Sequence, residues 1–180
     1  MKIAFLKYAG LGIGGVERYL QSIALLVKAK GHEVDYYYTN AAPIVGTNWV
    51  HPPNSPLRKS VMEDAGINLI KVKVGYKNYD PNAPLGEIWR DSDIFEKFDE
   101  SKYDLLFIAG NGKADYPASL FNKVKIVYSI HGDHAYDQDN IVKSLLICDW
   151  QAQRWLRNGG NNSKLDILPP IVEIPTNYPT

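Results

Sequence analysis

The stretch that decides the fold is AGLGIGGVERY, residues 9–19, which joins a short apolar run to a helical pattern. Four of the six residues from position 10 to position 15 are glycine. Lys2–Leu6 before it has the composition of a buried strand, and from Val16 onward the apolar residues recur at helical spacing. The stretch therefore predicts a strand, a glycine loop and a helix in direct succession.

The same alternation continues along the rest of the chain. Strands separated by helical segments imply a parallel sheet covered on both faces, with ligand-binding loops at the carboxyl ends of the strands. The predicted fold class is therefore α/β, a Rossmann-like open and mostly parallel sheet with helices on both faces. We expect further strands over Glu33–Tyr38, Ile67–Val74, Tyr103–Ala109, Val124–Ile130, Ser144–Cys148 and Leu165–Leu168, and further helices over Leu57–Ala65, Ile88–Phe98 and Asp149–Arg157.

Composition limits the class of protein. The chain has 180 residues, of which 45% are hydrophobic and 22% charged, and this balance is typical of one globular domain. Twenty basic residues balance twenty acidic ones, so no overall field favours nucleic acid as a partner. Cys148 is the single cysteine, which indicates a reducing compartment, and we expect it in the core. No apolar run is long enough for a transmembrane segment, so we expect a cytoplasmic protein.

The glycine loop has two interpretations that involve a nucleotide. Gly10, Gly12 and Gly15 satisfy the pattern G-x-G-x-x-G, and Asp35 follows twenty residues later, as in NAD(P)-binding domains. However, three residues separate the first strand from Gly10, and Asp35 comes early in the second strand rather than at its tip. We therefore keep an NAD(P)-binding domain only as the less favoured alternative.

The more general property of the loop is that it can approach an anion. Gly14 and Gly15 lie at the start of the predicted helix, where free amide groups favour a phosphate and the missing side chains allow close approach. Glu17 suits the positive end of the helix but would repel a phosphate, so we expect it to bind hydroxyl groups or to brace the loop. The alternative is that the glycines serve only the turn and the helix packing.

Two other loops follow predicted strands at the same edge. His131, Asp133 and His134 come directly after the fifth strand, and Asn111 follows the fourth. Side chains at the carboxyl ends of parallel strands are placed to contact a ligand. Asn111 and Asp133 could instead be ordinary loop residues, and Asp133 with His134 lacks the spaced third ligand of a metal site, so we expect no metal.

The chain resembles a known family in several segments that occur in the same order. MKIAFL, GGVERYLQSIALLVKAKGHEV, VKIVYSIHGD and KLDILPPIVE are similar to the amino-terminal half of GT-B glycosyltransferases, and especially to the retaining, glycogen-synthase-like group. The resemblance covers nearly the whole chain. It implies an acceptor-side domain over residues 1–168 and an interdomain linker or tail over 169–180, with the donor-binding domain outside this sequence.

The resemblance also implies roles for particular residues. Gly14 and Gly15 would approach the diphosphate of a nucleotide-sugar donor, and His131 would line the pocket of the transferred sugar as the catalytic residue. Glu17, Asn111 and Asp133 would contact the acceptor or the sugar, although many relatives have a histidine near the position of Asn111. The nucleotide sugar is a co-substrate, and we expect no further cofactor.

The resemblance implies partners as well as residues. The partners would be the nucleotide sugar, a glycan or small-molecule acceptor and a donor-binding domain or subunit, without which we expect no activity. A non-catalytic Rossmann-like binding module is the second interpretation.

Overall fold

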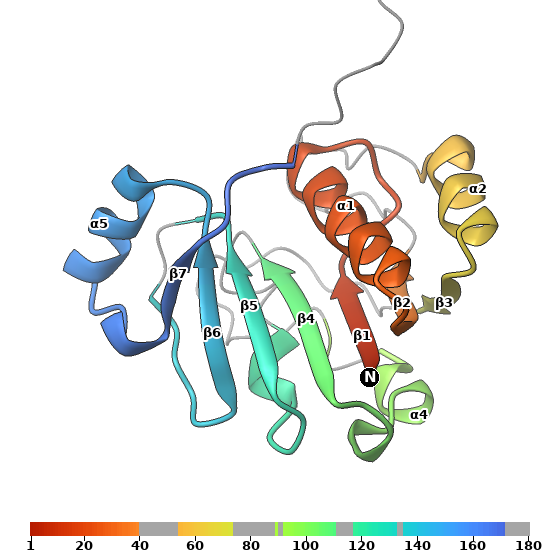
Figure 1. Ribbon diagram of the computed structural model, residues 1–180. Coiled ribbons are helices and arrows are strands. Elements are labelled where there is room, and N and C mark those ends of the chain that lie inside the picture. The colour runs from red at the N-terminus through yellow and green to blue at the C-terminus, as the bar shows by residue number, and fades with distance from the viewer. Residues whose placement is uncertain (40–53, 74–88, 90–91, 111–116, 133–134, 172–180) are drawn as a thin grey trace, which may run out of the picture.

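The computed structural model describes residues 1–39, 54–73, 89, 92–110, 117–132 and 135–171, which form a sheet with helices packed on it (Figure 1). The sheet has seven strands in the order β3-β2-β1-β4-β5-β6-β7, and every neighbouring pair is parallel. The strands are β1 (Lys2–Lys7), β2 (Glu33–Thr39), β3 (Asn68–Val72), β4 (Leu105–Gly110), β5 (Ile126–Ile130), β6 (Ile141–Leu146) and β7 (Leu165–Ile167).

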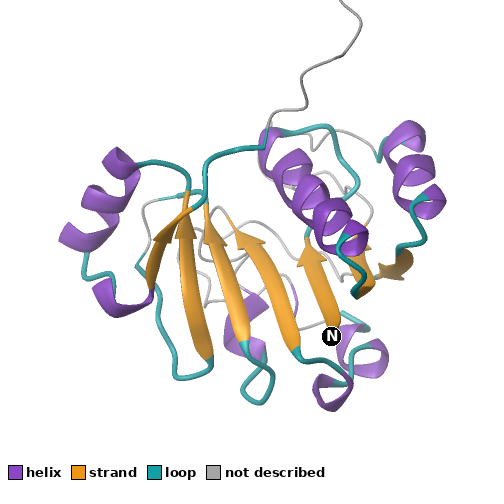
Figure 2. Cartoon of the chain, in the orientation of Figure 1, coloured by secondary structure: helices purple, strands orange, loops and turns teal. Residues whose placement is uncertain are grey.

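Helical segments connect these strands across both faces of the sheet (Figure 2). They are α1 (Gly15–Ala29), α2 (Pro56–Asp64), α4 (Ile94–Lys97), α5 (Asp149–Arg157) and the 3₁₀ turns η1 (Glu100–Lys102), η3 (Pro117–Leu120) and η4 (Asn162–Lys164). The chain order reverses between β1 and β4, because β2 and β3 lie on one side of β1 and the later strands on the other. An open parallel sheet binds its ligands at such a reversal, outside the carboxyl ends of the strands. The predicted α/β, Rossmann-like fold class is confirmed.

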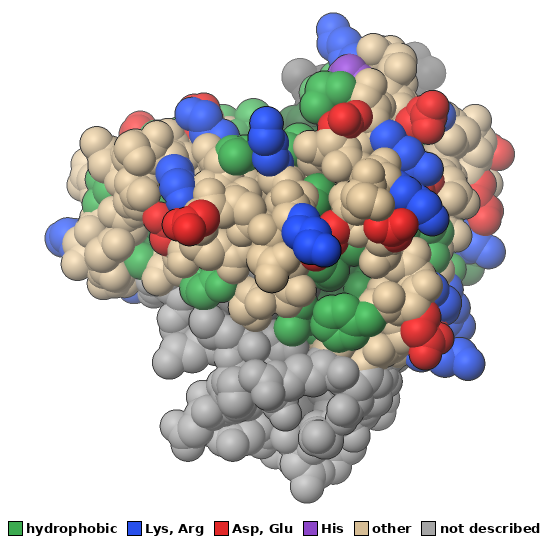
Figure 3. Space-filling view, turned by 90° about the horizontal axis from the view of Figure 1, so that it is seen from below, with side chains coloured by type: hydrophobic (Ala, Val, Ile, Leu, Met, Phe, Trp, Pro, Cys, Tyr) green, Lys and Arg blue, Asp and Glu red, His purple; other side chains and the backbone are tan. Residues whose placement is uncertain are grey.

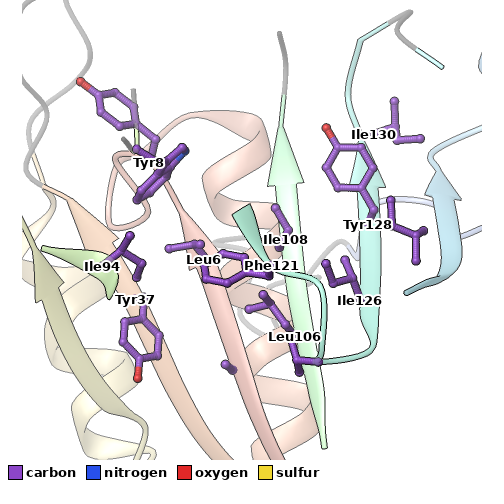
Figure 4. Close-up of a cluster of buried hydrophobic side chains, with 14 of the residues drawn as sticks. Leu6, Tyr8, Tyr37, Ile94, Leu106, Ile108, Phe121, Ile126, Tyr128 and Ile130 are labelled. Carbon is purple, nitrogen blue, oxygen red and sulfur yellow. The ribbon is translucent and has the colours of Figure 1, made fainter. Parts of the chain in front are cut away.

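Side chains alternate between the two faces of the sheet, and both faces are buried. On β1, Ile3 and Phe5 belong to the core under α1, whereas Ala4 and Leu6 belong to the core on the opposite face. Figure 4 shows part of this second core, to which β1, β4 and β5 contribute Leu6, Leu106, Ile108, Ile126, Tyr128 and Ile130. A sheet that is apolar on both sides explains why its strands are apolar runs in the sequence.

The helix boundaries follow local signals in the sequence. Gly31 and Gly66, which follow α1 and α2, have positive φ angles of 85° and 75°, a conformation that glycine adopts without strain. The Ser55 hydroxyl accepts a hydrogen bond from the amide of Arg58 at 3.3 Å and caps α2. These stops leave short connections, so each helix packs against the strands beside it.

The structure differs from the sequence prediction at three places. The sixth strand is Ile141–Leu146 rather than Ser144–Cys148, so Cys148 has already left the sheet and lies exposed before α5. The prediction that Cys148 belongs to the core is therefore wrong. The helix expected over Ile88–Phe98 ends where the prediction places it, because Phe98 is extended, but α4 begins only at Ile94. Residues 88, 90 and 91 lie outside the described ranges.

The edge that carries the amino ends of the strands is polar and mixed in charge. In the view from below, acidic and basic side chains alternate over the described residues of this face, with apolar groups between them (Figure 3). Among the helices that the structure describes, none combines the length and the apolar character that crossing a membrane requires.

Candidate functional site

The candidate site lies at the carboxyl edge of the sheet, on the face that α1 covers. Ile3, Phe5 and Lys7 alternate along β1 so that Lys7 belongs to the α1 face, and Ser129 and His131 follow the same alternation at the end of β5. Ala109 on β4 lies between β1 and β5 and pairs with Ser129 in the ladder. Because Ala109 is small, side chains from β1 and β5 can approach each other across β4.

The glycine loop is held in shape by hydrogen bonds to its own carbonyl groups. The buried Gln21 of α1 donates from Nε2 to the carbonyl oxygens of Gly10 and Gly12, at 2.8 and 3.1 Å. The amide of Gly10 donates to the Lys7 carbonyl at 3.1 Å, and Ala9 takes a positive φ of 52°, which is uncommon for a residue with a side chain. The loop is therefore a defined turn rather than a loose connection.

Gly10 is required by a close approach of Tyr36 from β2. The Tyr36 hydroxyl donates to the Gly10 carbonyl at 3.0 Å, and a Cβ at position 10 would lie only 2.8 Å from Cε1 of the Tyr36 ring. Burial raises the pKa of Tyr36, and the nearby Glu17 carboxylate raises it further, so the phenol stays a neutral donor. This glycine serves the packing of the loop, as the structural interpretation of the motif expects.

Gly14 and Gly15 stand at the start of α1 in different surroundings. A Cβ on Gly14 would collide with Oε2 of Glu17, so the Glu17 carboxylate lies directly against Gly14. A Cβ on Gly15 would meet no atom within 4 Å among the described residues. Glu17 is the third residue of α1, where a carboxylate is stabilised by the positive helix end. The Glu17 carboxylate thus occupies the position beside Gly14, whereas no described atom occupies the corresponding position beside Gly15.

Lys7 and Glu17 form a buried ion pair beneath this helix start. The Lys7 Nζ lies 3.4 Å from Oε1 of Glu17, and the two side chains are 2% and 12% exposed. Burying an ammonium group costs several kcal/mol unless an opposite charge and hydrogen bonds compensate for it. The Glu17 carboxylate therefore offsets part of the cost of a charged group at this buried strand end, which explains why it turns inward.

His131 is held on the other side of β4 by two buried neighbours. Its Nε2 lies 2.9 Å from the Ser129 hydroxyl, and its ring meets the edge of Tyr19 with centroids 5.0 Å apart. Its amide donates to the Gly110 carbonyl at 3.2 Å, which joins the ends of β5 and β4. Burial lowers the pKa of His131 to about 4, with a further contribution from the positive charge of Lys7. The imidazole is therefore neutral at pH 7.

The backbone around His131 is braced from α5. Gln151 donates from Nε2 to the Ile130 carbonyl at 2.9 Å, and its Oε1 accepts from the amide of Ile147 at the same distance. The side chain of Gln151 thus links the end of β5 to the residue that follows β6. The loop that carries His131 is consequently tied to the sheet on both sides.

The structure brings four of the predicted site residues to one edge, namely Gly14, Gly15, Glu17 and His131. Asn111 and Asp133 lie outside the described residues, and the functional roles of all six predicted site residues stay predictions. Sequence reasoning missed Lys7, Ser129 and Tyr19. Two signals could have found the first two: a charged residue that ends a buried strand, and a serine two positions before His131 on the same face.

Asp35 is used by the fold at the opposite edge. Its two carboxylate oxygens accept hydrogen bonds from Asn68 at 2.9 Å and from the hydroxyl of Tyr103 at 2.6 Å, and Lys2 lies 3.5 Å away. The register pairs Asp35 with Ala4, near the amino end of β1. This carboxylate is too far back along β2 to bind a ribose at the carboxyl edge, which disfavours the dinucleotide interpretation.

Over the described parts of the chain, no three His, Cys, Asp or Glu side chains gather as metal ligands.

Among comparisons with known proteins, only those with solved structures give a match, and they bear on the fold of this chain. Neither a family model nor a curated protein matches the sequence. Among solved structures, Anabaena Alr3699/HepE in complex with UDP and glucose matches with a TM-score of 0.57 and 16% identity, over 94% of this chain and 44% of that one. The same protein in complex with UDP-glucose matches with a TM-score of 0.54, 16% identity and the same coverage.

A weaker match is the glycosyltransferase VinC in complex with dTDP, with a TM-score of 0.38, 13% identity, and coverage of 88% of this chain and 38% of that one. The chain spans less than half of each matched structure, so the HepE likeness defines the class of fold: an α/β domain like one part of a larger nucleotide-sugar-bound protein.

Proposed function

We propose that this chain is the acceptor-side domain of a nucleotide-sugar-dependent glycosyltransferase with the GT-B fold, of the retaining glycogen-synthase-like group, and inactive without a donor-binding domain. The observation that carries the proposal is the carboxyl edge itself, where the glycine loop, Glu17 and His131 meet on a fold like that of HepE. The HepE structures contain UDP, glucose or UDP-glucose. A nucleotide sugar is therefore the first ligand to test.

The two glycines of the pair are not equally suited to contact the diphosphate. A Cβ on Gly15 would meet no described atom within 4 Å, and Gly15 lies in the first turn of a 15-residue helix, where amide groups favour a phosphate oxygen. The Glu17 carboxylate occupies the position beside Gly14 and repels phosphate there. We assign the diphosphate contact to Gly15, and we assign Glu17 to a hydroxyl group of the acceptor or the sugar.

His131 acts as a hydrogen-bonding residue rather than as an acid. Its pKa of about 4 leaves it neutral at pH 7, so it has no proton to give to a leaving group. Ser129 occupies Nε2, which leaves Nδ1 for a sugar hydroxyl. Departure of a diphosphate needs positive groups or oriented dipoles around it, and the described residues supply the start of α1 and the partly neutralised Lys7. A donor-binding domain would supply the remainder.

The test is an NMR titration of the 180-residue chain with UDP-glucose, UDP and NAD, each to about 10 mM, because half of a binding cleft binds with a Kd on the order of millimolar. We expect UDP-glucose and UDP to shift the amide signals of Gly15 and His131, and NAD to leave them in place. The His131→Asn and Gly15→Ala variants should lose this response. His32→Asn is the matched control, since His32 lies between α1 and β2 at the opposite edge.

Three other results would contradict the proposal. Strong binding of NAD would restore the dinucleotide interpretation of the glycine motif. UDP-glucose binding that is unchanged in both His131→Asn and Gly15→Ala, or no binding of any nucleotide at this edge, would favour the non-catalytic binding module.

A further inference from the structure

Tyr19 lies between His131 and the chain that leaves β7. Its ring meets the His131 ring edge-on, with centroids 5.0 Å apart and an interplanar angle of 75°. Its hydroxyl donates to the Leu168 carbonyl at 3.0 Å, across 149 positions of sequence. The side chain is only 4% exposed. One buried residue of α1 therefore contacts both the imidazole of the candidate site and the last part of the sheet.

Among the described residues, Leu168 is the last one that donates a backbone hydrogen bond to the sheet. Its amide donates to the Leu146 carbonyl at 2.9 Å, and its side chain packs against the core under α1. Pro169 and Pro170 follow and have no amide to donate, so they add no further ladder bond. Leu146 and Tyr19 thus hold the chain where it leaves β7, and Figure 1 shows this last described part of the chain passing close to the start of α1.

A phenylalanine would fill the same space but would not make this connection. Burial raises the pKa of Tyr19, and a hydrogen bond with Ser129 partly opposes that shift. Ser129 also holds Nε2 of His131 at 2.9 Å and is fully buried. His131 therefore touches both residues, with its Nε2 at the Ser129 hydroxyl and its ring at the Tyr19 ring, and the hydroxyl of Tyr19 extends these contacts to Leu168.

We propose that Tyr19 is a positioning residue that couples the His131 imidazole to the exit of the chain from β7. This inference rests on the proposed function, in which His131 contacts the sugar and the segment after Leu168 leads toward the donor-binding domain. The coupling makes the orientation of His131 depend on where that segment lies. In the complete enzyme, the placement of the second domain and the geometry of the sugar pocket are then set together.

The experiment is a coupling cycle read by NMR on the 180-residue chain labelled at histidine and at backbone nitrogen. Ser129→Ala releases Nε2 of His131, and the Leu168 amide reports whether that change reaches the end of β7. We expect Ser129→Ala to shift the Leu168 amide in the wild-type background, and this shift to be lost when Tyr19→Phe is already present. Tyr19→Phe alone should keep the ring-current effect on His131, and Tyr19→Leu should abolish it.

The matched control is Tyr37→Phe, which removes a hydroxyl from another buried tyrosine. The Tyr37 hydroxyl bonds to the Lys97 carbonyl at 3.2 Å and to the Tyr103 hydroxyl at 2.6 Å, in the core on the opposite face. In that background Ser129→Ala should still shift Leu168. An equal shift of Leu168 in the wild-type and Tyr19→Phe backgrounds would show that Tyr19 only fills space, and it would overturn the inference.

A UDP-glucose titration of the same samples separates this inference from the proposed function. A positive coupling cycle in a protein that does not bind UDP-glucose supports the positioning role and refutes the donor assignment. UDP-glucose binding at Gly15, together with an equal Leu168 shift in the wild-type and Tyr19→Phe backgrounds, supports the donor assignment and refutes the positioning role.

Discussion

The Lys7–Glu17 pair offers the sharpest quantitative test of the site. We consider Lys7→Met, Glu17→Gln and the double variant, because each replacement removes a charge and keeps nearly the same shape. The Lys7 and Glu17 side chains are 2% and 12% exposed, with Nζ and Oε1 3.4 Å apart. Removing one partner of such a pair strands a charge in a poorly solvated place.

The two single variants should differ in cost. Glu17→Gln leaves the ammonium group buried, so we expect the free energy of unfolding to fall by about 3 kcal/mol. Lys7→Met leaves the carboxylate at the start of α1, where the helix end offsets part of the loss, and we expect a fall of about 2 kcal/mol. The double variant strands no charge, so it should lose only about 1–2 kcal/mol rather than the roughly 5 that simple addition gives.

Urea unfolding followed by circular dichroism measures all four proteins under the same conditions. The predicted coupling of about 3–4 kcal/mol is well above the deviation of about 0.5 kcal/mol that independent sites show. Additive losses would refute the claim that Lys7 and Glu17 act as a pair. Losses below about 1 kcal/mol in both single variants would refute the claim that the pair is buried.

Three further predictions concern other residues of the fold and site. Burial and Lys7 lower the pKa of His131 from 6.5 to about 4, so the unfolded chain binds the proton more tightly than the folded chain does. The free energy of unfolding should therefore fall by up to about 3 kcal/mol as the pH drops from about 6.5 toward 4. In urea unfolding, His131→Asn should remove this part of the pH dependence. Gly10→Ala should lower the stability by about 1–3 kcal/mol because its Cβ would crowd the Tyr36 ring. Gly15→Ala should keep or raise the melting temperature, and equal melting temperatures for the two alanine variants would contradict this distinction between the glycines. Asp35→Asn should cost about 1–3 kcal/mol in urea unfolding and leave UDP-glucose titrations unchanged, whereas a loss of nucleotide binding would show that Asp35 belongs to the site.

Much of the architecture could be predicted because strand and helix signals are local. The glycine stops after α1 and α2, the apolar strands and the helical spacing after Gly15 all come from neighbouring residues. The error at Cys148 has a physical cause: the sixth strand begins at Ile141, although Val142 and Lys143 are exposed, so its pattern does not resemble that of a buried strand. Tertiary pairing with β5 decides that boundary, and the sequence contains no local mark of it.

The residues of the candidate site likewise fall into those that local sequence patterns indicate and those that only the tertiary structure brings together. His131 and the glycine pair could be named from sequence, because the carboxyl end of a strand and the start of a helix are positions that a local pattern defines. Lys7, Ser129 and Tyr19 become meaningful only when β1, β5 and α1 are brought together, with Ala109 of β4 in between.

The sequence by itself determined the class of fold, since periodicity and turn residues act over a few positions. The tertiary structure alone decided which charges are buried, which side chains His131 touches and where the chain leaves the sheet. Those properties depend on contacts between residues far apart in the chain.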